Sequence, residues 1–155
     1  MNDVELLIDV RAAPGSRRMP HVGKGALEVS LPPRGIAYEH MPELGGRRQS
    51  RPDSINAGWR NVSFRAFADY MQEDAFRVAL EALEKKAGER RSAIMCAEAV
   101  PWRCHRSLIS DALTVRGVEV RHITGRSLPS LHTVTAFAVV DNGRISYPAA
   151  DTLTM

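Results

Sequence analysis

The sequence has few cysteines, few lysines and no long apolar run, and each shortage excludes a class of protein. Two cysteines are too few for the disulfide framework of a small secreted domain, so we expect reduced thiols in a cytoplasmic protein. No apolar run approaches the roughly 20 residues of a membrane-spanning helix. The N-terminal residues also lack the basic flank of a signal peptide. We therefore expect no membrane partner.

Lysine is rare among the basic residues: of 21 lysines and arginines, only Lys24, Lys85 and Lys86 are lysine. The planar guanidinium of arginine binds phosphate or carboxylate at two points, whereas the lysine ammonium is a point charge. GC-rich coding also favours arginine, and the formal net charge of +3 is modest. The arginine bias therefore indicates an anionic partner only where arginines cluster.

The sequence does contain enough apolar residues, 44% of the chain, to form one domain. A chain of this length buries roughly 70% of its surface on folding. Apolar runs with β-branched residues predict strands, and apolar residues at i, i+3 and i+4 predict helices. The expected strands are 4–10, 35–40, 92–98 and 118–124, the expected helices are 24–31, 64–71, 76–87 and 104–116, and 42–61 is expected to be a long surface loop.

Strands that alternate with helices are typical of the α/β class with a mostly parallel sheet. The tripeptide Asp141-Asn142-Gly143, between two β-like runs, predicts a hairpin at the C-terminal end. We therefore expect a single α/β domain over 1–155, in which helices flank a mostly parallel sheet and a β-hairpin follows.

Polar side chains come at the end of each expected strand. In parallel sheets the ligand crevice lies outside the carboxyl ends of the strands. We therefore expect one shared pocket, formed by Asp9, Arg11, Tyr38, His40, Cys96, Glu98 and His122.

The stretch AIMCAEAVPWRCHRS, residues 93–107, has the densest group of reactive side chains. A helix that begins near Cys104 would direct its free amide groups and its positive dipole end at an anion, with Arg103 and Arg106 beside it. A cysteine at such a position, next to His105, also has surroundings that lower the pKa of a thiol. Three interpretations stay open: an anion cradle, a nucleophile at Cys104, or a cysteine that packs in the core.

Glu98 follows an apolar strand, where partial burial would suit it to acid/base chemistry with His105. It could equally orient Arg11 or Arg106. The cysteines lack the short spacing of a structural zinc site, so we expect no metal. No motif in the sequence identifies a cofactor. A phosphatase loop is excluded because six residues, rather than five, separate Cys96 from the next arginine and because the loop has no glycine.

A second arginine cluster, LGGRRQSRP at 44–52, contains Arg47 and Arg48. Arginines combined with aromatic faces such as Tyr38 and Trp59 suit phosphate contacts and base stacking in single-stranded nucleic acid or a nucleotide. The alternative is a solvated loop whose arginines bind nothing.

The segments DVRAAPGSRR, GIAYEHMPELGGRR, FRAFADYM and CAEAVPWRCHRSLISDAL, in this order, resemble the domain of unknown function 488 family. The resemblance covers about Asp9 to Tyr147, and its most specific element is the pairing of CAE with CHR. It implies an α/β domain but no reaction. The residues that recur in the family correspond to Asp9, Arg11, Tyr38, His40, Gly45, Gly46, Tyr70, Cys96, Glu98, Cys104, His105 and Arg106.

Similar chains usually carry a further strand, ending in a Gly-His-Ser-like motif, and a helix before the DVR strand. This sequence starts at Met1, just before that strand. An expectation that follows is a homo-oligomer in which a second copy covers the exposed sheet edge.

The leading hypothesis is an anionic, nucleotide-like or nucleic-acid ligand at the carboxyl ends of the strands, with acid/base hydrolysis as its chemistry. In this hypothesis Glu98, His105 and Cys104 are the catalytic candidates, and the ligand-binding candidates are Asp9, Arg11, Tyr38, His40, Arg47, Arg48, Arg103 and Arg106. The alternatives are a non-enzymatic module that binds nucleic acid or protein, and a thiol redox protein that uses Cys104.

Overall fold

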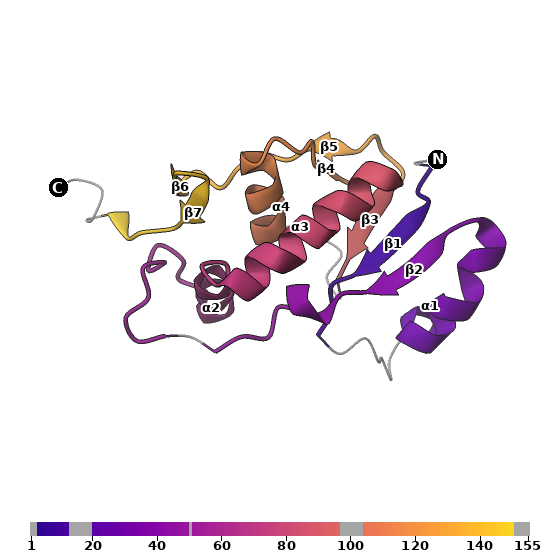
Figure 1. Ribbon diagram of the computed structural model, residues 1–155, viewed down its shortest axis with the longest axis horizontal. Helices are drawn as coiled ribbons and strands as arrows, with labels where there is room; N and C mark the ends of the chain where they lie inside the picture. Colours follow the sequence, from indigo (N-terminus) through magenta and orange to yellow (C-terminus); the bar gives the residue numbers. More distant parts are fainter. Residues whose placement is uncertain (1–2, 13–19, 50, 97–103, 151–155) are drawn as a thin grey trace.

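A computed structural model of the chain describes residues 3–12, 20–49, 51–96 and 104–150 (Figure 1). Its centre is a three-stranded parallel sheet in the order β2-β1-β3. The three strands are β1 (Leu6–Asp9), β2 (Ala37–His40) and β3 (Ser92–Met95). The middle strand continues into Val10, and Leu6, Ile8 and Val10 are almost completely buried. The structure therefore confirms the α/β class and the parallel sheet.

The register of the sheet brings the carboxyl ends of the strands to one level. Asp9 of β1 lies opposite His40 of β2 and Met95 of β3. The next backbone groups extend the ladder, since the amide of Val10 donates to Met95 at 3.0 Å and the amide of Met41 donates to Asp9 at 2.9 Å. Polar residues just after β1, β2 and β3 are therefore held at the same edge.

The described residues form four α-helices, and apolar side chains of three of these helices form the core with the sheet. The helices are α1 (Lys24–Ser30), α2 (Val62–Tyr70), α3 (Asp74–Glu89) and α4 (Arg106–Val115), with short 3-10 turns η1 (Pro20–Val22), η2 (Pro32–Arg34) and η3 (Pro42–Leu44). The side chain of Asn61 caps α2 by accepting hydrogen bonds from the first-turn amides of Ser63 and Phe64. One cluster of buried apolar side chains joins β1 to α2, α3 and α4, as the i, i+3, i+4 pattern predicted.

Two small antiparallel pairs follow α4. The first pairs β4 (Arg121–His122) with β5 (Ser130–Leu131), and the second pairs β6 (Val139–Asp141) with β7 (Arg144–Ser146). Figure 1 places β6 and β7 at the opposite end of the molecule from α1. Asn142 and Gly143 turn between β6 and β7 with φ of 52° and 79°, which is the left-handed backbone that a two-residue hairpin requires. The predicted C-terminal hairpin is confirmed.

Two expectations about the chain were wrong. Residues 118–124 do not join the parallel sheet, because only Arg121 and His122 form a strand and they pair with β5 instead. A parallel sheet is buried on both faces, whereas Arg121 is exposed. Residues 42–61 are also not a simple surface loop, because Leu44 and Asn56 are completely buried. The Asn56 amide donates to Asp69 at 2.8 Å and its oxygen accepts the amide of Tyr147 at 2.8 Å, so side-chain bonds replace water here.

Among the described residues, no helix is long and apolar enough to cross a bilayer.

Candidate functional site

The first part of the site is a buried carboxylate at the end of β1. Asp9 accepts hydrogen bonds from the Arg11 backbone amide at 3.0 Å, from its Nε at 2.9 Å and from its Nη2 at 2.7 Å. The Tyr38 hydroxyl donates a fourth at 2.5 Å. Burial alone would raise the pKa of Asp9, but the hydrogen bonds from Arg11 and Tyr38 outweigh it and lower the pKa below its ordinary value. Asp9 is therefore a carboxylate at neutral pH.

The side chains around Asp9 make hydrogen bonds to other groups of the chain. Arg11 also donates to the carbonyl of Val22 at 2.8 Å, so its guanidinium is shared between two internal acceptors. Burial, followed by the charge of Asp9, raises the pKa of Tyr38 and keeps its hydroxyl protonated. His40 lies with Nε2 2.6 Å from the carbonyl of Arg11. The structure thus brings four of the predicted residues together, and they hold the strand ends in place.

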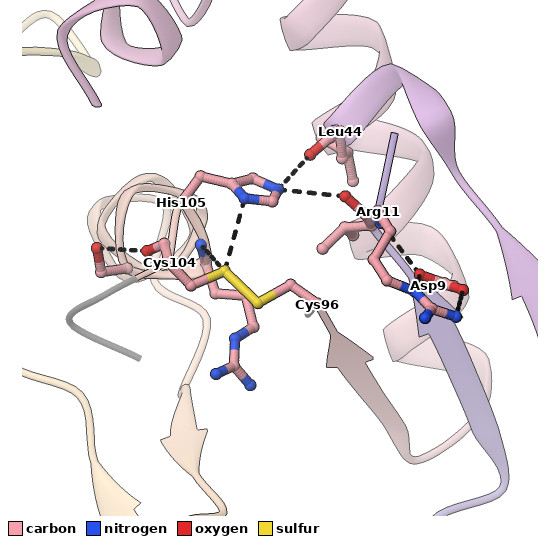
Figure 2. Close-up of a disulfide and its surroundings, with 9 residues drawn as sticks. Asp9, Arg11, Leu44, Cys96, Cys104 and His105 are labelled. Carbon is pink, nitrogen blue, oxygen red and sulfur yellow. Dashed lines mark hydrogen bonds and ion pairs between the residues drawn. A yellow bond between two sulfur atoms is a disulfide. The ribbon is translucent and has the colours of Figure 1, made fainter. Parts of the chain in front are cut away.

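The second part of the site is His105, at the start of α4. Its Nε2 lies 2.8 Å from the carbonyl of Leu44 and 3.2 Å from that of Val10. Figure 2 shows the ring of His105 directed towards Leu44 on one side and Cys104 on the other. Because a carbonyl only accepts, Nε2 carries the ring hydrogen and Nδ1 is left with a free lone pair. Burial lowers the pKa of His105, and the two hydrogen bonds to carbonyls only partly oppose it. The ring is therefore neutral near pH 7, with a basic Nδ1.

That lone pair faces a sulfur atom. Nδ1 of His105 lies 3.5 Å from Sγ of Cys104, and the backbone amide of Arg106 donates to the same sulfur at 3.3 Å. Cys104 therefore caps the first turn of α4 with its side chain and is almost completely buried. It forms a disulfide with Cys96, which follows β3 (Figure 2). The expectation of reduced, unpaired cysteines was wrong, because the end of β3 and the start of α4 bring the two sulfurs together.

Two glycines allow this approach. A Cβ atom on Gly46 would lie 2.7 Å from Nδ1 of His105, and a Cβ on Gly45 would lie 3.0 Å from both the Cα of Ala12 and the carbonyl of Pro42. The first distance is closer than real side chains show, and the second is tight enough that the backbone would have to move slightly. Gly46 therefore lets the loop pass over the histidine, and Gly45 lets it pack against the end of β1.

The arginine-rich loop lies on α2, beside this site. Arg48 donates to the carbonyls of Gly45 at 3.2 Å and Glu43 at 2.9 Å, and its guanidinium lies 3.5 Å from the centre of the Tyr70 ring. Arg51 pairs with Glu73 at 2.9 Å, whereas Arg47 is exposed. An open groove of about 440 Å³ runs between these side chains. Arg48 is thus mainly structural, whereas Arg47 and Arg51 are both exposed and Arg51 is paired with Glu73.

The predicted stacking residues and the predicted shared pocket need correction. Trp59 packs edge-on against Phe64 and Phe137 in the core, with ring centres 5.1 and 4.8 Å apart, so it is no stacking platform for this loop. His122 does not join the strand-end pocket, because it belongs to β4, outside the parallel sheet. Glu98 and Arg103 lie outside the described residues. Arg106 begins α4, and its charge acts on both His105 and His122.

Sequence reasoning missed the buried network around Asp111. This aspartate lies in α4 among Leu108, Ile109, Ala112 and Leu113, and its side chain is completely buried. A lone carboxylate inside an apolar helix pattern was a usable signal, since buried acids need partners. Those partners come from residues well beyond the helix, and local patterns do not reveal them.

Among the described residues, no group of three histidine, cysteine, aspartate or glutamate side chains is arranged to hold a metal ion. The family model for the domain of unknown function DUF488 matches residues 1–113. No curated protein and no solved structure matches the chain. The match covers the strand-end carboxylate, both cysteines and His105, and it ends within α4.

Proposed function

The chain belongs to the DUF488 family, a domain of unknown function, and we propose that its site catalyses thiol–disulfide exchange through Cys104 and Cys96. The observation that supports this most is the basic Nδ1 of His105 beside Sγ of Cys104, in a cysteine that pairs with Cys96. The sequence left this role open as the alternative to anion binding. The geometry favours it because the sulfurs and the base are held in contact, whereas Arg11 and Arg48 are satisfied within the chain.

The surroundings of Cys104 stabilise a thiolate. Its sulfur lies at the positive end of the α4 dipole and accepts the amide hydrogen of Arg106. The neutral His105 can accept the thiol proton at Nδ1, because the carbonyls of Leu44 and Val10 hold the other ring hydrogen at Nε2. A thiolate so stabilised is a good leaving group in exchange reactions.

Burial decides which sulfur reacts first. Cys104 is 4% exposed, whereas Cys96 is only partly buried. A substrate thiolate therefore attacks Sγ of Cys96; a sulfur–sulfur bond forms there, the Cys96–Cys104 bond breaks, and Cys104 leaves as the thiolate. A second substrate thiolate then attacks the substrate sulfur of the mixed disulfide. Two substrate thiols are oxidised to one disulfide, the protein disulfide is reduced to two thiols, and the two substrate protons pass to the protein sulfurs.

The test uses the full chain with each cysteine replaced in turn. Oxidised wild type and the Cys104→Ser variant are treated with a small thiol and its disulfide, such as the two forms of glutathione, and then examined by intact mass. We expect wild type to gain two free thiols, and Cys104→Ser to hold the small thiol on Cys96 as a stable mixed disulfide. In His105→Gln, closure of the disulfide in the reduced chain by the small disulfide should slow by about tenfold or more, because no base accepts the Cys104 proton, while His21→Gln, at an exposed position in η1, should leave the rate unchanged. Equal rates in His105→Gln and wild type would contradict the proposal.

A second candidate function is the binding of an anionic, nucleotide-like ligand in the groove beside the arginine-rich loop. It is supported by the exposed Arg47 at a groove that also contains Tyr70 and Arg51. We expect nucleotides, an oligonucleotide or inorganic phosphate to raise the melting temperature of wild type but not of Arg47→Ala. Arg34→Ala, at an exposed arginine in η2, is the matched control. Stabilisation by the oligonucleotide alone, lost steeply with salt, would instead identify a nucleic-acid module; no stabilisation would remove this candidate.

A further inference from the structure

A separate polar cluster lies on the other side of the first turns of α4, mostly beyond the residues that the family model matches. It borders a cavity of about 400 Å³, large enough for a small molecule. The cavity lining includes His122, His132, Ser107, Ser130 and the Trp59 side chain. None of these residues belongs to the thiol site proposed above.

The base of the cluster is Asp111. Its Oδ1 accepts from the Thr135 amide at 3.0 Å and from Nε2 of His132 at 2.7 Å. Its Oδ2 accepts from the Thr135 hydroxyl at 2.6 Å and from the Tyr147 hydroxyl at 2.8 Å. Burial, then the nearby Asp111, raises the pKa of Tyr147, so this hydroxyl remains a donor. All four contacts fit an aspartate that only accepts, which is its carboxylate form.

This acceptor fixes the direction of the hydrogen bonds through both histidines. Asp111 accepts from Nε2 of His132, so that nitrogen carries a hydrogen, and in the neutral ring Nδ1 of His132 is an acceptor. Nδ1 lies 2.7 Å from Nε2 of His122, which must therefore donate. The remaining ring nitrogen of His122, Nδ1, is left with its lone pair. The cluster is thus an ordered relay from a buried carboxylate to a basic nitrogen at the cavity.

Burial and the charges around His122 keep that nitrogen unprotonated near neutral pH. Burial lowers the pKa of His122, a proton on His132 and the charge of Arg106 each lower it further, and Asp111 opposes them. These groups come from α4 and from the chain after β5, and together they leave the ring neutral near pH 7. When His122 takes up a proton, the relay to Asp111 stabilises the resulting charge, as in other histidine–aspartate pairs.

Side chains with hydroxyl groups line the cavity in which a ligand would bind. Ser130 of β5 is the residue directly opposite His122 in the β4–β5 pair. Ser107, in the first turn of α4, also lines the cavity while its hydroxyl donates to the carbonyl of Cys104 at 3.1 Å. Trp59 adds an apolar wall. The cavity therefore offers a base, hydroxyl groups for a polar oxygen, and an apolar surface for the rest of a small ligand.

We propose that this cavity is a second, hydrolytic site, in which His122 is the general base and small carboxylic esters are the substrates. Nδ1 of His122 takes a proton from water as the water oxygen attacks the carbonyl carbon. The tetrahedral intermediate then expels the alcohol oxygen, which takes the proton back from His122. One ester bond and one water are consumed, and one acid and one alcohol are formed. His132 and Asp111 are positioning residues that hold the tautomer of His122.

A purely structural role explains only part of this arrangement. Hydrogen bonds to Asp111 hold His132, Thr135 and Tyr147 against α4. This structural role does not require His122. His122 bonds to His132 and lines the cavity. Among the described side-chain hydrogen bonds, His122 connects no further helix or strand. The separation allows the two roles to be tested separately.

The test measures hydrolysis of p-nitrophenyl acetate and butyrate in a Cys96→Ser/Cys104→Ser background, so that neither thiol contributes and failure of the thiol proposal does not affect the outcome. His122→Gln keeps a donor for His132 but removes the base, and we expect kcat/KM to fall by about 100-fold or more. His132→Gln should also lower kcat/KM and should move the midpoint of the pH–rate profile upwards, because the second imidazole lowers the pKa of His122 when both rings compete for a proton. His21→Gln is the control.

Equal hydrolysis by the Cys96→Ser/Cys104→Ser parent and by the same chain with His122→Gln, or hydrolysis no faster than in buffer for either ester, would overturn the proposal. Nitrogen chemical shifts of the histidine rings provide a measurement that needs no variant to fold. They should show Nδ1 of His122 without hydrogen in the unmodified chain, and a hydrogen on Nδ1 would contradict the relay.

Discussion

The two histidine sites differ in what fixes the histidine tautomer. At the sheet edge, backbone carbonyls of Val10 and Leu44 fix the ring of His105. Beyond α4, a side-chain carboxylate fixes the rings of His132 and His122. Backbone acceptors belong to the fold and survive most substitutions, whereas the second arrangement depends on one aspartate. The sheet-edge site should therefore resist mutation, and the second site should fail when Asp111 is changed.

The largest expected effect tests that dependence. Asp111→Asn places an amide NH₂ against donors from Thr135 and Tyr147, and it removes the charge that His132 contacts. We expect a loss of about 3 kcal/mol in the free energy of unfolding, measured by chemical denaturation. The control, Asp74→Asn, changes a largely exposed carboxylate and should cost little. A loss below about 1 kcal/mol for Asp111→Asn would contradict the role of this residue.

A smaller effect is expected where the loop passes over His105. Gly46→Ala adds a Cβ that would lie 2.7 Å from Nδ1, so either the ring or the loop must shift. We expect a loss of about 1–3 kcal/mol and slower thiol exchange. Gly88→Ala is the matched control, because it lies within α3 with no atom near the added Cβ and should stabilise the helix by up to about 1 kcal/mol. Equal effects of the two substitutions would show that the contact at His105 is unimportant.

The smallest expected effect is a shared pH dependence. The pKa values of His105 and His122 are lowered in the folded chain from 6.5, so the unfolded chain binds more protons as the pH falls below 6.5. Stability should therefore be full above that pH, fall as the pH drops through it, and level off below the folded pKa values. Denaturation at several pH values between 8 and 5 gives the free energy of unfolding. This free energy should change less with pH in His105→Gln and in His122→Gln than in wild type. A wild-type free energy of unfolding that rises as the pH is lowered from 8 to 5 would contradict this prediction.

The sequence predicted the sheet edge because its residues are local to the elements that hold them. Asp9 and His40 each end an apolar run, and parallel pairing places them at one level. Gly45-Gly46 and the CHR segment carry their own turn and helix-start signals. The pairing of Cys96 with Cys104 was not predicted, because it depends on the distance between β3 and α4 rather than on spacing in the chain.

The second site was not predicted from the sequence, for the same reason. Its partners are separated by up to 36 residues, from Asp111 to Tyr147, and they meet through short strands with weak patterns. His122 was placed at the end of an expected parallel strand, and the partly exposed β4 pairs with β5 instead. Burial of a carboxylate inside a helix was the one local sign that distant donors had to exist.

The central claim, a thiolate prepared by His105 and the first turn of α4, is tested most directly by titrating Cys104 alone. In Cys96→Ser, the ultraviolet absorbance of the thiolate is followed against pH. We predict an apparent pKa below about 8.5, the ordinary value for a thiol, and an upward shift when His105→Gln is added. An ordinary or raised pKa in Cys96→Ser, unchanged by His105→Gln, would contradict the account.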